Sequence, residues 1–405
     1  MYNSNMKSRY QFRIYPSDQQ RKDLAKLFGC TRVVWNDALA LCKQSEKLPS
    51  TGDLQKICIT QAKKTPERVW LSEVSNIALQ QAIADLGIAF KNFFQSRNGK
   101  RKRQKMNPPR FKRKTNQQSA RLTRGGFNIK AEQVFLAKIG WIKTRWSRPL
   151  PCEPSSVTVI KDTANRYFLS FVVEIQPEIK PAMNESLGID LGLKTFAALS
   201  TGENIASPDY SKLDRKIRRA QRKFSRREKG SKRRERMRLK VARLKAKERD
   251  TRKDFLHKLS SRVVSESQVI VLEDLNVSGM LKNRCLSRAI SKCGWREFRT
   301  MCEAKSNKFG REFVVISRWE PTSQICSDCG YRWGKLDLSI REILCINCGT
   351  HQDRDTNASR NIANVGVGHI HDSKWTLRGC KTSVEAVPVE VSTRLKYVQL
   401  SLFDW

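Results

Sequence analysis

The feature of this sequence that most constrains its fold is a pair of Cys-x2-Cys motifs separated by 15 residues. Cys326 and Cys329 form the first motif, and Cys345 and Cys348 form the second. Four thiolates with this spacing can surround one tetrahedral Zn²⁺, and because they fill every position around the metal, the site is structural. The segment 321–349 is therefore predicted to be a zinc ribbon that holds one zinc ion.

Three carboxylates predict a second kind of metal site. Asp190 stands in the strand-like segment 187–193, and Glu273 stands in the segment 269–275, whose apolar start is typical of a central strand. Asp355 follows the second cysteine pair. Magnesium prefers oxygen ligands, and two Mg²⁺ ions about 3.5–4 Å apart can support phosphodiester hydrolysis. We therefore predict a nuclease site with two Mg²⁺ ions and three acids.

The residues by themselves leave alternatives for two of these acids. Asp274 competes with Glu273, and Asp353 competes with Asp355. An Asp-x-Asn sequence at the start of a helix is also common capping chemistry. Both choices stay open at the level of the residue pattern.

The residues around Asp190 predict a β-hairpin. The strand that holds Asp190 is expected to turn back into the apolar segment 196–199. Gly188 and Gly192 flank Asp190, and their lack of side chains would let a phosphate backbone approach.

The positive charge predicts a nucleic-acid partner. The chain has 405 residues, with 79 Lys and Arg against 39 Asp and Glu, which gives a formal charge of +40. Such an excess is self-repulsive unless a polyanion neutralises it. No stretch approaches the ~20 apolar residues that span a bilayer, and the N-terminus lacks an apolar signal core. We therefore expect an intracellular protein without a membrane partner.

Two basic segments are predicted to contact nucleic acid. The proline-rich stretch 97–114 is expected to be a loop that orders on a phosphate backbone, with Arg110 and Lys112 as contacts. The stretch 213–258 has a basic helical pattern broken at Gly230, which predicts two antiparallel helices that face nucleic acid. Its candidate contacts are Arg226, Arg227, Arg233 and Arg234.

Hydrophobic periodicity predicts a small β-barrel interrupted by helices. A capping-box pattern at Ser17 and Gln20 opens a helix that is expected to stop at Gly29. A second amphipathic helix is predicted at 76–94, and a buried strand at 313–316. The barrel strands are predicted at 9–14, 134–136, 141–144, 157–160 and 167–173.

Taken together, these motifs resemble those of the TnpB family, the transposon-encoded relatives of type V CRISPR effectors. The resemblance extends to about Ala363, and Ser359 departs from it because the family usually has Ala there. The stretches that carry it include Phe12-Arg-Ile-Tyr-Pro, Pro109-Arg-Phe-Lys, Gly188-Ile-Asp-Leu-Gly, Glu273-Asp-Leu, Cys326-Ser-Asp-Cys-Gly, Cys345-Ile-Asn-Cys-Gly and Asp353-Arg-Asp-Thr-Asn-Ala.

The resemblance implies an α+β multidomain fold. This fold has a split wedge-like β-barrel with a helical recognition insertion, and a RuvC-type, RNase H-like α/β nuclease domain with a zinc-ribbon insertion. It implies that Asp190, Glu273 and Asp355 are the catalytic acids. It also implies a guide RNA derived from the transposon end and a double-stranded DNA target next to a short adjacent motif. Asn76 and Gln80 match the position that reads this motif.

The resulting expectation is an RNA-guided, Mg²⁺-dependent DNA endonuclease that acts as a monomeric ribonucleoprotein in the prokaryotic cytoplasm, at the nucleoid. A guided DNA-binding repressor without cleavage and a compact type V CRISPR effector are the alternatives, and the three acids favour cleavage. The expected boundaries are 1–45 for the first part of the wedge and a helix, 46–105 for the recognition domain, 106–184 for the rest of the wedge, 185–320 for the nuclease domain with a basic insertion at 211–260, 321–349 for the zinc ribbon, 350–368 for the last nuclease segment and 369–405 for a disordered tail.

Overall fold

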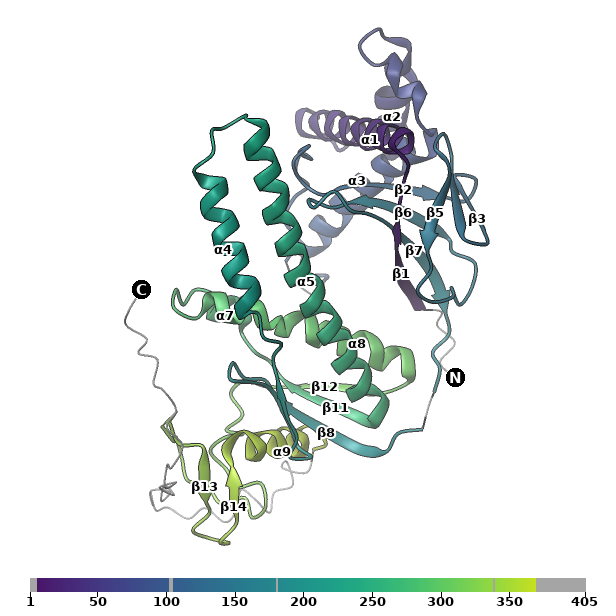
Figure 1. Cartoon of the computed structure of the whole chain (residues 1–405). Helices are drawn as coiled ribbons and strands as arrows, with labels where there is room; N and C mark the ends of the chain where they lie inside the picture. Colours follow the sequence, from purple (N-terminus) through teal and green to yellow (C-terminus); the bar gives the residue numbers. More distant parts are fainter. Residues whose placement is uncertain (1–5, 102–104, 180, 338, 369–405) are drawn as a thin grey trace. The chain divides into compact units, whose positions relative to one another are not determined.

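The computed structural model of the chain describes residues 6–101, 105–179, 181–337 and 339–368 (Figure 1). The predicted tail at 369–405 lies outside the described residues. The chain divides into two compact units, one formed by Met1–Gln176 and Leu213–Ala246 and the other by Pro177–Lys212 and Lys247–Trp405. Within the described ranges, no helix is both long and apolar enough to cross a membrane.

The first unit is built on an antiparallel sheet of seven strands in the order β2-β6-β7-β1-β5-β4-β3. Its first strand, β1 (Met6–Ile14), pairs along its whole length with β7 (Tyr167–Ile175). The two edge strands, β2 (Gln118–Thr123) and β3 (Phe127–Lys130), are joined by a turn of only three residues, which brings the edges together. The sheet is therefore nearly closed, as the predicted barrel requires. The other strands are β4 (Gln133–Leu136), β5 (Gly140–Arg145) and β6 (Ser156–Lys161).

Alternating apolar side chains fill this nearly closed sheet. Phe12 and Ile14 of β1 are buried, and the Phe12 ring lies 6.0 Å from that of Phe171 and 4.6 Å from that of Trp146, centroid to centroid. The predicted strands of the barrel are confirmed. We did not predict β2 and β3, because β2 buries only Ala120 and Leu122 and β3 is a four-residue strand, which gives too little periodicity.

The helix α1 (Asp18–Gln44) begins as predicted but ends later. Ser17 Oγ accepts a hydrogen bond from Gln20 N, and Gln20 Oε1 accepts one from Ser17 N, so the capping box is confirmed. The predicted end at Gly29 is wrong. Beyond Gly29 the helix keeps burying its apolar stripe, as at Val34, and this burial outweighs the ~1 kcal/mol cost of a glycine inside a helix.

The helical region of the first unit ends in α3 (Asn76–Arg97), which confirms the second predicted helix. Its buried side chains include Leu79, Ile83 and Leu86. Between α1 and α3 lie only short helical turns, namely α2 (Thr51–Gln55), η1 (Lys56–Gln61), η2 (Ala62–Lys64) and η3 (Val69–Glu73).

Residues 110–112 of the basic stretch after α3 are already held by the protein. Asn36 Nδ2 donates to Lys112 O at 3.1 Å, and Lys112 N donates to Asn36 Oδ1 at 2.8 Å. Trp35 Nε1 donates to Arg110 O at 3.1 Å. The prediction that this stretch orders on a phosphate backbone is therefore wrong for these residues, because α1 supplies their backbone partners.

The second unit contains a five-stranded sheet in the order β10-β9-β8-β11-β12. The strands β8 (Asn184–Asp190), β11 (Ser267–Glu273) and β12 (Glu312–Ile316) are parallel. The strands β9 (Thr195–Leu199) and β10 (Asn204–Ala206) run antiparallel, so the predicted hairpin after Asp190 is confirmed.

The outer strands of this sheet correct one prediction. β11 is central, and Ile270, Val271 and Leu272 are fully buried, as its apolar sequence predicts. We predicted a buried strand at 313–316, but β12 is an edge strand, and all but the last residue of that range are only half-buried.

Two long basic helices lie in the chain between β10 and β11. They are α4 (Ser211–Ser225) and α5 (Lys232–Glu266), and they run antiparallel with a break at Gly230, as predicted (Figure 1). The second helix is longer than expected. Its last turns bury Leu256, Leu259 and Val263 in the core of the second unit. The remaining helices are α6 (Val277–Met280), α7 (Ser287–Cys293), α8 (Trp295–Phe309) and α9 (Arg354–Gly366).

Candidate active site and zinc ribbon

Two parallel strands place the first two acids side by side. Ile189 of β8 pairs with Leu272 of β11. Asp190 and Glu273 are the next residues along these strands, and each is the last residue of its strand. Because successive side chains of a strand alternate between the two faces, residues at equivalent positions of in-register parallel strands share one face. Both carboxylates therefore lie at the carboxyl end of the sheet.

The helix α9 brings the third acid to this end. A Cβ atom on Gly188 would lie 2.0 Å from Ser359 O, and one on Gly366 would lie 2.4 Å from Val271 Cγ1. Only glycine allows so close an approach of helix to sheet. This corrects our interpretation of Gly188, whose missing side chain makes room for α9 rather than for a phosphate backbone. Asp355 stands in the first turn of α9.

The electrostatics of Asp190 show that the other two acids lie close enough to act on it. Burial raises the pKa of Asp190 to about 7, and the negative charges of Asp355 and Glu273 add to this rise. Burial also raises the pKa of Glu273, against the opposing effect of Arg318. Carboxylates that repel one another in a half-buried site would be stabilised in their ionised form by a bound cation.

The alternative acids have other partners. Asp274 Oδ1 accepts from Arg299 Nη1 at 2.6 Å and its other oxygen bonds to Arg318, and these guanidinium groups lower its pKa. Asp353 caps α9, since its Oδ1 accepts from Asp355 N at 3.0 Å and from Thr356 N at 2.9 Å. Asp274 is thus engaged in ion pairs and Asp353 in capping a helix, which favours Glu273 and Asp355 as the acids of the site.

The ligand atoms of the three acids lie farther apart than the ligands of one metal ion would. Among the described residues, the four cysteines are the only group of three or more His, Cys, Asp or Glu whose ligand atoms all lie within 4.8 Å of one another. Two ions about 3.5–4 Å apart would each use part of a carboxylate set, so a wider spread fits a two-metal site. Arg341 Nη1 lies 3.4 Å from both oxygens of Asp355 and supplies a counter-charge.

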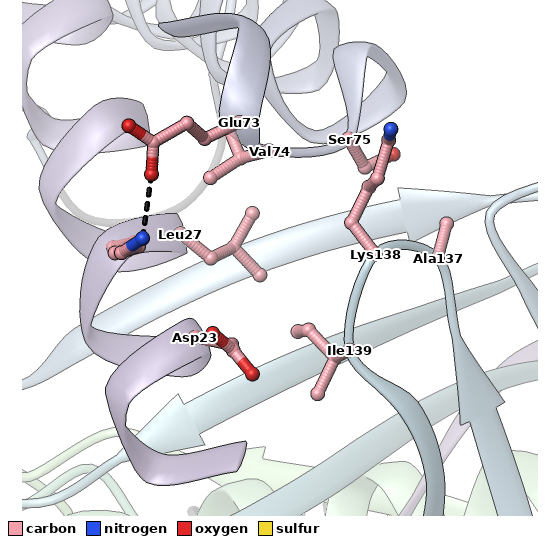
Figure 2. A pocket seen from close by; sticks show the side chains of 9 residues that line it. Asp23, Leu27, Glu73, Val74, Ser75, Ala137, Lys138 and Ile139 are labelled. Carbon is pink, nitrogen blue, oxygen red and sulfur yellow. Dashed lines mark hydrogen bonds and ion pairs between the residues drawn. The ribbon is translucent and has the colours of Figure 1, made fainter. Parts of the chain in front are cut away.

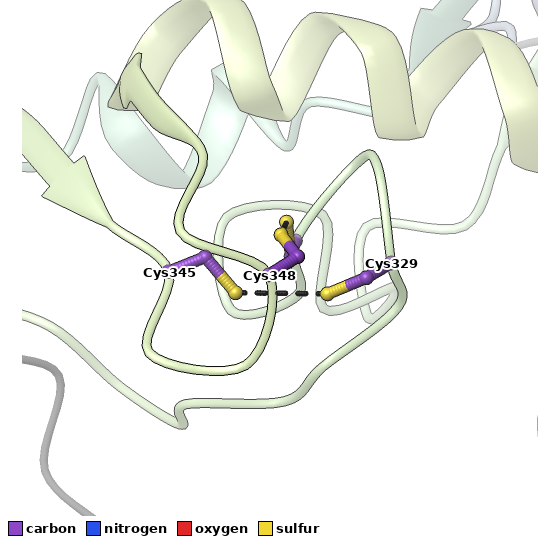
Figure 3. Close-up of side chains that lie close together, drawn as sticks. Cys329, Cys345 and Cys348 are labelled. Atoms are coloured by element: carbon purple, nitrogen blue, oxygen red, sulfur yellow. Dashed lines mark hydrogen bonds between the residues drawn. The ribbon is translucent and has the colours of Figure 1, made fainter.

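The four cysteines meet as a tetrahedral zinc site requires. The Sγ atoms of Cys326 and Cys348 lie 3.8 Å apart, and those of Cys329 and Cys345 lie 3.6 Å apart. Figure 3 shows Cys329, Cys345 and Cys348 turned toward one another. Tetrahedral bonds of about 2.3 Å from zinc to sulfur would separate the sulfurs by about 3.8 Å. The residues present therefore fit one structural zinc ion.

Each cysteine pair is held by the same backbone turn. Cys326 O accepts from Gly330 N, and Cys345 O accepts from Gly349 N. Gly330 and Gly349 have φ angles of 74° and 73°, in the left-handed region that favours glycine. The Cys-x2-Cys-Gly sequence thus specifies this geometry locally.

A buried amide network joins the zinc ribbon to α9, and sequence reasoning missed it. Asn357 Oδ1 accepts from Ser327 N and from Gln352 Nε2, each at 2.8 Å. Asn361 Nδ2 donates to Ile325 O and to Thr322 O, each at 2.7 Å. The signal available in the sequence was the spacing of the two asparagines, four residues apart on the helix that carries Asp355.

The candidate contacts on the basic helices are not equivalent. Arg226, Arg227 and Arg233 are exposed. Arg234 instead places its guanidinium 4.4 Å from the centroid of the Phe224 ring and bonds to Arg227 O. Arg234 therefore closes the turn between α4 and α5, and the three exposed arginines are the better candidates for phosphate contacts.

The other candidate contacts lie in the first unit. Asn76 is exposed and Gln80 half-exposed at the start of α3, where Asn76 Oδ1 accepts from Lys63 Nζ at 3.1 Å. Arg110 is exposed, whereas the Lys112 ammonium lies 3.8 Å from the centroid of the Trp35 ring. Burial lowers the pKa of Lys112. Their contacts with nucleic acid stay predictions.

A small hollow near the start of α3 is too small for a nucleotide. Figure 2 shows side chains that line this pocket in the first unit. The pocket has a volume of about 40 Å³, and Lys26 Nζ lies 2.6 Å from Glu73 Oε2 in an ion pair. Its volume admits only a few water molecules. Its lining consists of Asp23, Lys26, Leu27, Glu73, Val74, Ser75, Ala137, Lys138 and Ile139.

Solved structures share this fold. The chain superposes on Cas12f1 in its complex with sgRNA and target DNA with a TM-score of 0.53 and 13% identity, over 88% of this chain and 98% of that one. A mini-RNA-guided endonuclease, CRISPR-Cas_phi3, gives a TM-score of 0.50 and 11% identity, over 90% and 92%. The chain therefore shares its overall fold with these two proteins.

Sequence comparisons agree along the chain. Residues 170–284 match the family "Probable transposase" (OrfB_IS605), and residues 295–362 match "Cas12f1-like, TNB domain". Residues 5–47 match a helix-turn-helix domain, although here they form β1 and the single helix α1.

Full-length relatives identify the family. Over 374 residues the chain is 44% identical to a "Putative RNA-guided DNA endonuclease" of Streptomyces pristinaespiralis, which covers 89% of this chain and 90% of that protein. It is 29% identical over 388 residues to "Putative RNA-guided DNA endonuclease InsQ" of Escherichia coli K12, with coverage of 89% and 92%. The chain belongs to the TnpB family.

Proposed function

We propose that this protein is an RNA-guided, Mg²⁺-dependent DNA endonuclease. The observation that carries the proposal is the convergence of Asp190, Glu273 and Asp355 at the carboxyl end of one sheet. The relatives are named as RNA-guided DNA endonucleases, which supports a guide RNA derived from the transposon end and a double-stranded DNA target for this chain.

The fold supports the nuclease part at the level of topology. The strands of the second sheet lie side by side in the order β10-β9-β8-β11-β12. The strand β9 runs antiparallel to β8, whereas β11 and β12 run parallel to β8. This mixed sheet supports the RuvC-type, RNase H-like domain that the resemblance implies. The domain boundaries given above, including the wedge, the recognition insertion and the zinc ribbon, are part of the proposal.

The three acids would hold the two Mg²⁺ ions. When bound, these ions would supply an activated water and neutralise charge at the leaving oxygen. Asp190, the acid on which the other two act, would be the central ligand of this set. Arg341, at 3.4 Å from Asp355, holds that carboxylate in place and presents a cation at the site.

Target selection would be divided between RNA and protein. Pairing with a guide reads most of the target, and the protein reads only a short adjacent motif. Asn76 and Gln80 lie one helical turn apart on α3, and an amide can pair bidentately with adenine. We assign the reading of the adjacent motif to this turn, in a monomeric ribonucleoprotein that works in the prokaryotic cytoplasm.

The test uses the protein with the RNA that copurifies with it. Sequencing that RNA defines a guide, and a plasmid library with a matching target and randomised flanks then reports cleavage. Asp190→Ala should abolish cleavage while target binding stays near the wild-type level, because binding rests on many Lys and Arg contacts. Wild-type protein that binds the target without cutting it would instead establish a guided repressor, and near-normal cutting by Asp190→Ala would reject the site.

A further inference from the structure

One aromatic side chain stands out next to the acid site. Trp319 is 86% exposed, more than any other aromatic side chain among the described residues. It directly follows Arg318, whose guanidinium bonds to Asp274 and acts on the pKa of Glu273. The indole of Trp319 buries little of its surface within the protein, and tryptophan rings are enriched at interfaces because they combine a large apolar face with a polar N–H group.

The loop that carries Trp319 is fixed at both ends. At its start, Asp274 N donates to Ile316 O at 3.0 Å, at the end of β12. At its far end, the buried residue Thr322 accepts from Asn361 Nδ2 of α9 at 2.7 Å. The loop therefore spans from the strand beside Glu273 to the helix α9, which carries Asp355 in its first turn.

The turn itself is also ordered by hydrogen bonds. Trp319 N donates to Ser317 Oγ at 3.3 Å, and Glu320 N donates to Ser317 O at 3.2 Å. With Arg318 anchored on Asp274, the backbone on both sides of Trp319 is held. Stacking on a backbone that is already ordered costs little further conformational entropy.

We propose that Trp319 is a stacking platform for one unpaired base of the DNA strand being cut, beside the scissile phosphate. This inference rests on the proposed nuclease function. A phosphodiester at the acids brings its own bases to the rim of the site, and each base has a π-face that an exposed indole can cover. Stacking does not discriminate strongly between bases, which suits an enzyme whose sequence choice belongs to a guide.

The test compares single-turnover cleavage of the guided target by wild type, Trp319→Ala and Trp319→Phe. The wild-type cut position is mapped first, and abasic nucleotides are then placed one at a time on either side of it. On natural DNA, Trp319→Ala should cut about tenfold more slowly, and Trp319→Phe should keep most of the rate. One abasic position should slow the wild type by a similar factor and should not slow Trp319→Ala further.

Trp141→Ala is the matched control, because Trp141 is an exposed tryptophan of the first unit (41%) that packs on Phe135. It should retain the wild-type rate and the wild-type response to abasic positions. A natural rate in Trp319→Ala, or an undiminished abasic effect in that variant, would overturn the proposal while leaving the nuclease intact. Absence of cleavage by the wild type itself would instead reject the proposed function.

Discussion

At the scale of single residues, the charge state of Asp190 connects the fold to the chemistry. Its carboxyl group is half-buried at the end of β8, and two further acids act on it. Its pKa of about 7 means that, without a cation, this group still carries a proton in mildly acidic solution. The proton must leave before the carboxylate can bind Mg²⁺.

This gives a prediction for pH dependence. Below pH 7 the proton on Asp190 competes with Mg²⁺, so the apparent Mg²⁺ affinity should fall by up to about tenfold per pH unit, and it should level off above pH 7. Cleavage rates measured over a Mg²⁺ series at several pH values would show this. Asp274→Asn is the control, since the arginines beside Asp274 lower its pKa and it should not contribute to the profile. A Mg²⁺ affinity that is constant between pH 6 and pH 8 would contradict the assignment.

The neighbouring acids give a second prediction at this scale. Glu273→Ala and Asp355→Ala should abolish cleavage, as Asp190→Ala should, because each removes a metal-binding carboxylate. Asp353→Ala should cost only about 1 kcal/mol of stability through the lost helix cap and should retain cleavage. Cleavage rates and thermal unfolding of each variant measure both effects. An Asp353→Ala enzyme as inactive as Asp355→Ala would reverse the choice between them.

At the scale of elements, buried hydrogen bonds join the zinc ribbon to the helix α9. Among the described residues of the ribbon, the hydrophobic core consists of the buried side chains of Cys326, Trp333, Ile343 and Cys345, and a core of this size is too small to fold unaided. The buried amide network of Asn357 and Asn361 links this ribbon to the helix that carries Asp355. Loss of the zinc ion should therefore also disturb the position of Asp355 in the active site.

The corresponding prediction concerns the metal itself. Elemental analysis should find one zinc per chain in the wild type and less in Cys345→Ser, and the variant should also cleave more slowly because the support of α9 is lost. Cys302→Ser changes a buried cysteine outside the ribbon and should keep its zinc. Equal zinc in the wild type and Cys345→Ser would reject the ligand assignment.

On the basic helices α4 and α5, the exposed arginines can be tested against Arg234, which is engaged within the protein. Replacing Arg226, Arg227 and Arg233 by Ala should weaken nucleic-acid binding and reduce the slope of log affinity against log salt by up to about 3, since each lost phosphate contact removes roughly 0.9. Arg234→Ala should leave the slope unchanged, because that side chain is engaged with Phe224 and Arg227. An unchanged slope in the triple variant would assign these helices to a solvated face.

At the scale of the whole molecule, the charge of +40 makes the bound polyanion part of the stable state. Protein freed of nucleic acid should gain thermal stability as salt rises from about 0.05 to 0.5 M, because screening relieves the repulsion among its cations. The ribonucleoprotein should gain less or lose stability, since its phosphates already supply the counter-charge. Melting curves of the two preparations over the same salt series would decide this, and identical salt responses would contradict it.

The sequence by itself determined the local structures, namely the cysteine turns, a helix cap and an alternating strand. The Cys-x2-Cys-Gly repeats, the Ser17 capping box and the alternation in β1 each depend on residues a few positions apart, so their geometry follows from the local chain. The tertiary structure decided what depends on distant partners. Arg299 and Arg318 engage Asp274, and α9 explains Gly188. Such contacts join segments far apart in the chain, and no local pattern encodes which segments will meet.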